Sequence, residues 1–230
     1  MQVPSAAVHV GPIDGSALAL EQLHLDQGGE QIVEDPARDS LLYVASGSGT
    51  LGLDGTQHPL QARSAALVLA GERAAVTASE GLSLVVATVA EEADRHAPLG
   101  RREITASLDA GGSEQATGAR SFQLLFGPHN GSTRATLFAG FIPPGKAPWH
   151  YHLYDEIVWV PEGPGQLHIG DDTEELDAGS AFRLRPRHVH IVENASADRE
   201  LTVIGVFTPA GSPSAAYLTP DVAAEYRFAG

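Results

Sequence analysis

The feature that most constrains the fold is an internal repeat. Residues 11–78 align without a gap with residues 127–194, at a constant offset of 116 positions. Turn glycines fall on one another in the two copies: Gly11 on Gly127, Gly47 on Gly163 and Gly49 on Gly165. A repeat this long is a whole domain and not one turn of a solenoid. The sequence therefore predicts two copies of one fold in a single chain.

Each copy contains short apolar segments of strand type. In the first copy these include residues 41–44, 51–53 and 65–69, which are separated by glycine-rich turns. Short strands with turn residues every eight to twelve positions or so predict an all-β sandwich or barrel. The turn SGSG between residues 41–44 and 51–53 predicts a hairpin.

The repeat also predicts the domain boundaries. We expect an N-terminal barrel over residues 1–90, a linker over 91–120 and a C-terminal barrel with its tail over 121–230. Within the charged, glycine-rich linker, residues 101–108 are expected to form a short helix. A second short helix is expected at residues 221–226, where Asp221 would cap it.

Composition excludes several classes of protein. Hydrophobic residues make up 43% of the chain, which is enough for a core and too many for a disordered protein. Twenty-nine acidic and fourteen basic side chains give a net charge of −15, which argues against nucleic acid and anionic membrane as partners. The chain has no cysteine, so disulfides and thiolate metal sites are excluded. We see neither a long apolar run nor a signal peptide, which predicts a cytoplasmic protein.

One stretch of the second copy carries residues of metal-ligand type. His150 and His152 are two apart, so on a strand both side chains point to the same face. Glu156 follows after a bend that can bring its carboxylate to the two imidazoles. Such a set suits a first-row transition metal and leaves coordination positions open. His190, with His188 as a nearby alternative, is expected to supply a fourth ligand from a later strand.

These residues carry a resemblance to the cupin superfamily. The stretch GKAPWHYHLYDEIVWVPEG, residues 145–163, resembles the first cupin motif, and GSAFRLRPRHVHIVEN, residues 179–194, resembles the second. Arg185 and Arg187 stand where the second motif usually has proline and glycine. The resemblance implies an all-β bicupin, two tandem jelly-roll barrels in one chain. It also implies one divalent transition metal (Fe, Mn, Ni, Cu or Zn) bound by His150, His152, Glu156 and His190.

The first copy has lost this ligand set. Subtracting the offset from the four ligands gives Glu34, Pro36, Ser40 and Ala74, of which only Glu34 can bind a metal. We therefore expect a metal only in the second barrel, and a structural, interface-forming role for the first.

The function implied by the resemblance is a metal-dependent dioxygenase. Its substrate would be a small oxygenated compound, possibly aromatic and anionic, because similar bicupins with three histidines and one glutamate cleave flavonols. Glu156 would both bind the metal and accept a proton, and Arg185 and Arg187 would hold the anionic group. The alternatives are a non-redox isomerase, decarboxylase, hydrolase or cyclase, and a ligand-binding protein without catalysis.

Three further expectations concern aromatic residues and assembly. Tyr154 and Trp149 are expected to line a pocket at the metal motif. Trp159, whose position in its strand has the opposite parity, is expected to pack between the barrels or between subunits. A homodimer is the expected assembly, with a small molecule as the other partner.

Overall fold

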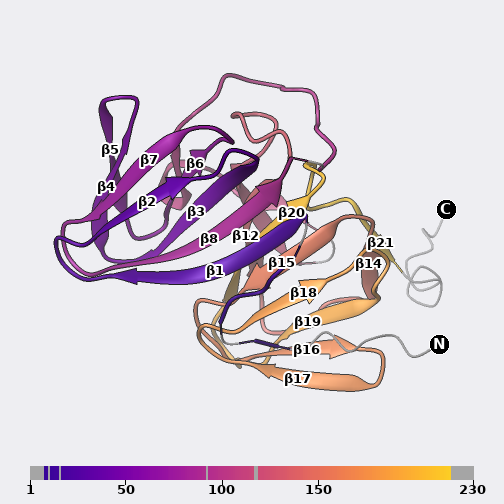
Figure 1. Cartoon of the computed structure of the whole chain (residues 1–230). Helices are drawn as coiled ribbons and strands as arrows, with labels where there is room; N and C mark the ends of the chain where they lie inside the picture. The colour runs from indigo at the N-terminus through magenta and orange to yellow at the C-terminus, as the bar shows by residue number, and fades with distance from the viewer. Residues whose placement is uncertain (1–7, 10, 16, 92, 117–118, 219–230) are drawn as a thin grey trace.

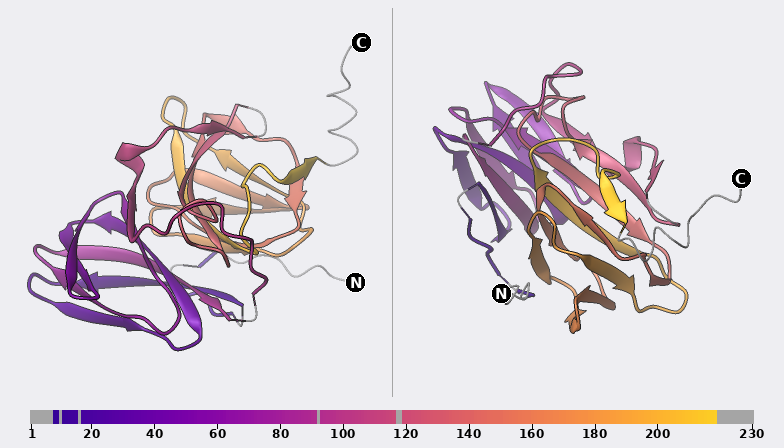
Figure 2. Two further views of the ribbon diagram at one scale, coloured as in Figure 1. Left: turned by 90° about the horizontal axis from the view of Figure 1, so that it is seen from above. Right: turned by 90° about the vertical axis from the view of Figure 1, so that its right-hand side faces the viewer.

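Two β-barrels lie side by side in the computed structural model, which describes residues 8–218 apart from 10, 16, 92, 117 and 118 (Figure 1). The views in Figure 2 show each barrel as two curved sheets facing one another. Within the described residues, no helix has the length and apolar character needed to span a bilayer.

The first barrel is built from eight strands and a ninth short one. They are β1 (Leu18–Leu25), β2 (Glu30–Glu34), β3 (Arg38–Ser46), β4 (Ser48–Leu53), β5 (Thr56–Gln61), β6 (Ser64–Val68), β7 (Arg73–Ala78), β8 (Leu82–Ala90) and β9 (Thr105–Ser107). One antiparallel sheet has the order β1-β8-β3-β6-β9 and the other the order β2-β7-β4-β5.

The second barrel contains the remaining strands. They are β10 (Glu114–Gln115), β11 (Ser121–Phe126), β12 (Thr136–Ile142), β13 (Gly145–Lys146), β14 (His150–His152), β15 (Asp155–Trp159), β16 (Gly165–Ile169), β17 (Asp172–Leu176), β18 (Ala181–Leu184), β19 (His190–Asn194), β20 (Leu201–Thr208) and β21 (Ala216–Leu218). Its sheets have the orders β10-β11-β12-β20-β15-β18 and β17-β16-β19-β14-β21, and β13 also pairs with β19.

The repeat in the sequence is a repeat of topology. The order β12-β20-β15-β18 in the second barrel reproduces the order β1-β8-β3-β6 in the first. The order β17-β16-β19 likewise reproduces β5-β4-β7 in the facing sheet. The prediction of an all-β chain with two tandem jelly-roll barrels is therefore confirmed.

The predicted hairpin at SGSG is wrong. β3 pairs with β6 and β8, whereas β4 pairs with β5 and β7, so the turn carries the chain from one sheet to the other. Gly47 has φ +84, and a Cβ there would lie 1.7 Å from the carbonyl oxygen of Gly81. The turn needs glycine because the crossing chain passes so close to a neighbouring backbone.

The segment between the barrels is also different from the prediction. Residues 105–107 form β9, which pairs with the edge strand β6, and Leu108–Ala110 form a 3₁₀ turn, η1, so the helix expected at 101–108 is wrong. Pairing satisfies the backbone groups of an otherwise open sheet edge, which a helix there would leave unmatched. β10 in turn pairs with β11 of the second barrel. The helix expected at 221–226 lies outside the described residues.

The largest cluster of buried apolar side chains lies between the barrels. It combines the outward-facing residues of β1, β3, β6 and β8 with those of β11, β12, β15 and β20. Trp159 is part of it: the indole Nε1 donates to Gln22 Oε1 at 3.1 Å, and the ring lies 6.3 Å from that of Tyr43. The expectation that Trp159 packs between the barrels is thus confirmed. Each barrel has its own interior core in addition.

Candidate metal centre

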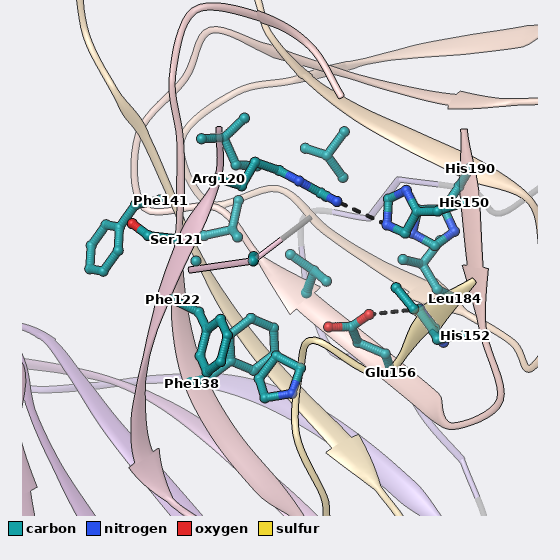
Figure 3. Close-up of a pocket in the computed structure, with 18 of the residues that line it drawn as sticks. Arg120, Ser121, Phe122, Phe138, Phe141, His150, His152, Glu156, Leu184 and His190 are labelled. Atoms are coloured by element: carbon teal, nitrogen blue, oxygen red, sulfur yellow. Dashed lines mark hydrogen bonds and ion pairs between the residues drawn. The ribbon is translucent and has the colours of Figure 1, made fainter. Parts of the chain in front are cut away.

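The four expected ligands converge in the interior of the second barrel. His150 and His152 lie on β14, His190 lies directly opposite His150 on β19, and Glu156 faces them from β15 in the other sheet. The ring centroids of His150 and His190 are 4.4 Å apart, and those of His152 and His190 are 5.1 Å apart. All four side chains are buried, and Figure 3 shows them grouped at one end of a cavity.

The backbone fixes the orientation of the three imidazoles. Each ring nitrogen Nδ1 lies within hydrogen-bond distance of a backbone carbonyl oxygen: His150 at 2.9 Å from Pro148, His152 at 2.9 Å from Tyr154 and His190 at 2.8 Å from His188. A carbonyl oxygen only accepts, so Nδ1 carries the proton and Nε2 keeps its lone pair. This is how proteins orient metal-binding histidines, because the second nitrogen is then free to coordinate.

Burial keeps two of the imidazoles neutral. It lowers the pKa of His150 to about 4, with a further lowering by the positive charge of Arg120. It also lowers the pKa of His190 well below the usual value, and His150 and His152 add to this effect. A neutral imidazole is the form that binds a metal, so the pair needs no deprotonation at neutral pH.

The chemical types of the four donors fit a divalent transition metal. Within the described residues, however, no three acidic or histidine side chains are yet close enough together to form a complete metal site. His152 Nε2 is buried without a hydrogen bond, and it lies 2.9 Å from Glu156 Oε2. Two ligands about 2.1 Å from one ion and at right angles are roughly 3 Å apart. An ion between these two atoms would satisfy a lone pair that the protein leaves unsatisfied.

A cavity of about 90 Å³ opens beside these ligands. Phe122 and Phe138 form part of an apolar wall (Figure 3). Arg120, which directly precedes β11, extends its side chain into the cavity. Its Nη1 lies 3.5 Å from His150 Nε2, and burial lowers the pKa of this guanidinium. The cavity is therefore lined by the cluster of metal-ligand residues, by the Arg120 guanidinium and by apolar side chains.

Tyr154 lines this cavity, as expected from the sequence. Its ring stacks on His152 with centroids 4.0 Å apart, and on Phe207 at the same distance. Burial, followed by the nearby Glu156, raises the pKa of its hydroxyl far above the usual value. Tyr154 thus stays protonated and holds one face of the His152 ring. Trp149 does not line the cavity.

The C-terminal segment covers the strand that carries the histidines. β21 pairs with β14, placing Leu218 opposite His150 and Ala216 opposite His152. Ala216 and Pro213 line the cavity, and the Tyr154 hydroxyl donates to the carbonyl oxygen of Pro213 at 3.3 Å. We call residues 213–218 the C-terminal strap.

Arg185 and Arg187 lie elsewhere. Both are exposed in the turn between β18 and β19, and neither is among the residues that line the cavity. Arg187 has φ +68, a left-handed conformation at the position where the second cupin motif usually has glycine, and its N–H donates to the His152 carbonyl at 2.8 Å. Their role in substrate binding stays a prediction. His188, the alternative to His190, is also absent from the cavity lining.

Arg120 is not among the site residues that the sequence predicts. It lies 30 positions before His150, outside both motif-like stretches, and no neighbouring residue marks it as functional. Arg120 also lies before the repeated residues 127–194, so the repeat gives no signal for it.

The first barrel has no corresponding cluster at the equivalent positions. Ala74 and Ser40 are buried there, and Ala74 belongs to an aliphatic core that fills the interior. Glu34 is exposed and its carboxylate lies 3.1 Å from Arg73 Nε. The barrel has kept its strands while apolar packing occupies the place of the ligands.

A comparison of the sequence with models of known protein families gives one match. Residues 139–207 match the model of the cupin domain. This range contains all four expected ligands, on β14, β15 and β19. This part of the second barrel belongs to the cupin domain family. No curated protein matches it in sequence.

Solved structures show the same two-barrel fold. AerE from Microcystis aeruginosa has a TM-score of 0.71 at 14% identity, covering 86% of this bicupin and 90% of the other chain. The putative glyoxylate induced protein from Pseudomonas aeruginosa has a TM-score of 0.73 at 16% identity, with coverages of 94% and 83%. Bacillus subtilis oxalate decarboxylase, a protein with Mn(II) centres, has a TM-score of 0.72 at 12% identity, with coverages of 93% and 77%. At these identities the likeness concerns the fold.

Proposed function

We propose that this bicupin is a metal-dependent enzyme that uses one divalent transition metal, held in the second barrel by His150, His152, His190 and Glu156. The observation that carries the proposal is the common orientation of the three histidines. Each donates a hydrogen bond from Nδ1 to a backbone carbonyl, and His152 Nε2 lies 2.9 Å from Glu156 Oε2. His152 Nε2 is buried without a hydrogen bond, whereas a purely structural buried histidine would use both nitrogens.

The protein residues around the ion would define its chemistry. A bound metal would act as a Lewis acid and, if redox-active, would let dioxygen react with the substrate. Glu156 can accept a substrate proton at the carboxylate oxygen that is not used for binding. Phe122, Phe138 and the strap give the cavity apolar walls, which strengthen electrostatic interactions inside it.

The first candidate reaction is that of a dioxygenase acting on a small oxygenated anion. Held by these four ligands, an octahedral ion would keep two positions open and could supply the chemistry of dioxygen activation. The cavity has a volume of about 90 Å³, and each water molecule in the liquid takes about 30 Å³. This size favours a small compound over the fused-ring aromatics cleaved by the bicupins that prompted the hypothesis.

A non-redox reaction is the second candidate, and Arg120 is the observation that favours it. A guanidinium beside the metal can neutralise a carboxylate and orient it for decarboxylation or isomerisation, without any need for dioxygen. Oxalate decarboxylase, among the proteins of the same fold, is named for such a reaction.

Three outcomes of one assay separate these candidates. The protein is purified without chelators, its metals are identified by elemental analysis, and small oxygenated acids are screened while dissolved oxygen is monitored. Oxygen uptake with turnover supports the dioxygenase, and turnover without uptake supports the non-redox enzyme. Saturable binding without turnover would leave a ligand-binding protein.

The metal centre itself is tested by His152→Ala. We expect about one metal per chain in the wild type and an affinity lower by about a hundredfold or more in the variant, because one of four ligands is lost. The far-ultraviolet circular dichroism should not change, because the strands remain paired. His96→Ala, which removes an exposed histidine, is the matched control. Two metals per chain in the wild type, or full occupancy in His152→Ala, would contradict the proposal.

A further inference from the structure

The unexpected residue in the cavity is Arg120, and its position relates it to the metal. Its Nη1 lies 3.5 Å from His150 Nε2, the same atom that carries the lone pair for coordination. When an ion takes that lone pair, the N–H of Arg120 loses this acceptor and remains next to the ion. Any ligand that occupies an open metal position beside His150 is then within reach of the guanidinium.

Charge balance inside the cavity points to the kind of ligand. Among the lining residues in the described part of the chain, only Arg120 and Glu156 carry formal charges, and these are opposite. The histidines are neutral when they coordinate. Binding a divalent cation therefore adds two positive charges next to this guanidinium, in a cavity with largely apolar walls. Such an excess is costly unless an anion lies between the two cationic groups.

The number of open coordination positions on the metal and the volume of the cavity narrow the class of ligand further. Four protein ligands leave two positions on an octahedral ion, which a carboxylate and a neighbouring oxygen of the same molecule can fill together. The second carboxylate oxygen can then accept from Arg120 in a charge-assisted hydrogen bond. The cavity volume of about 90 Å³ limits the ligand to a small molecule.

We propose that Arg120 is the specificity-determining residue of the site and that the substrate is a small carboxylate with an oxygen donor next to its carboxylate. This inference rests on the proposed metal centre. It assigns the anion-binding role to Arg120, inside the cavity, rather than to the exposed Arg185 and Arg187.

The test uses pyruvate as the probe and pyruvamide as its neutral counterpart, since both have the same number of non-hydrogen atoms. Calorimetry measures their binding to the full-length, zinc-loaded protein, and elemental analysis measures zinc before and after titration. The variants are Arg120→Gln, Arg120→Lys and Arg185→Gln, with Arg101→Gln as a control for the loss of an exposed positive charge.

We expect the wild type to bind pyruvate more tightly than pyruvamide. Arg120→Gln should weaken pyruvate binding about tenfold to a hundredfold, with unchanged zinc content and little effect on pyruvamide. The pyruvate affinity of Arg120→Lys should lie between those of the wild type and Arg120→Gln, because lysine keeps the charge and loses the planar guanidinium. Arg101→Gln and Arg185→Gln should bind like the wild type.

Several results would overturn the inference while the metal centre stands. These are equal or undetectable binding of pyruvate and pyruvamide by zinc-loaded wild type, wild-type affinity in Arg120→Gln, and a loss of affinity in Arg185→Gln instead. The wild-type comparison needs no substitution, so it decides the matter even if an Arg120 variant fails to fold. Failure of the wild type to take up zinc would overturn the metal centre and this inference together.

Discussion

At the scale of single residues, Arg187 shows how a motif position can be filled by an unusual side chain. The turn before His190 needs a left-handed residue, and its N–H must reach the His152 carbonyl to tie the two ligand-bearing strands together. Arginine adopts φ +68 there at a cost of about 1–2 kcal/mol relative to glycine. The contact with the metal-ligand strand offsets this strain.

Arg187→Gly is therefore expected to stabilise the protein. The relief of strain exceeds the added flexibility of the unfolded chain, which costs about 0.5–1 kcal/mol, so the net gain is about 0.5–1 kcal/mol. In a chain of this size the Tm should rise by about 1–3 °C. Arg185→Gly, at a neighbouring position whose φ is not positive, is the matched control and should lower the Tm. A fall of similar size in both variants would show that residue 187 is not strained.

The residues of the site differ in how well the sequence predicts them. The ligands could be predicted because strand alternation and motif spacing are local properties, and the structure brings His150, His152, Glu156 and His190 together. Arg120 could not, because its entry into the cavity depends on how β11 packs against strands far along the chain. The two exposed arginines drew attention through their proximity in sequence to His190 alone.

At the scale of elements, the strap is a part of the second barrel that has no counterpart among the described strands of the first barrel. β21 pairs with β14 beside both histidines, and it lies at the end of the strand order of its sheet. Edge strands with few neighbours open at lower cost than central strands. We therefore expect metal ions to reach the ligands when the strap separates from β14.

A disulfide between Tyr151→Cys and Tyr217→Cys tests this route. The two tyrosines are directly opposite in register and their rings stack 5.3 Å apart, so the backbone spacing suits a disulfide. The chain has no other cysteine. The oxidised variant should take up zinc about tenfold or more slowly than the reduced one, since the link suppresses opening. Each single-cysteine variant is the control, and equal rates in both redox states would place the entrance elsewhere.

The elements themselves could be predicted better than their connections. The offset of 116 positions foretold which strands correspond, because equivalent apolar patterns fold into equivalent strands. The SGSG turn misled because a glycine-rich turn looks the same in a hairpin and in a crossing between sheets. The helix expected at 101–108 failed because pairing with β6 outweighed local preference.

At the scale of the whole molecule, the two barrels share one buried face. Besides the apolar cluster, an ion pair crosses this face: Arg134 Nη1 donates to Asp39 Oδ1 at 3.0 Å, and the side chains are only 2% and 7% exposed. Asp39 Oδ1 also accepts from the backbone N–H of Ala70. This face gives the first barrel the interface role expected for it. Association of whole chains into a homodimer stays a prediction.

Asp39→Ala should destabilise the whole chain. The substitution leaves Arg134 buried without its counter-charge, which typically costs about 3–5 kcal/mol of unfolding free energy. Denaturant titration measures the effect, and a double variant with Arg134→Leu should recover most of it because no buried charge remains. Glu34→Ala, which breaks an exposed pair with Arg73, is the control and should cost less than about 1 kcal/mol. Equal losses in the two single variants would mean that the ion pair between the barrels contributes little.

The shared face also has a consequence for how the protein behaves on dilution. Where two separate chains bring barrels together, the pair dissociates once the concentration falls below its dissociation constant. Here both barrels are covalently linked, and each presents the other with an effective concentration that is fixed by the chain and independent of the number of molecules in solution. A barrel that has given up its own ligands thus serves as a permanent partner for the one that kept them, however scarce the protein becomes.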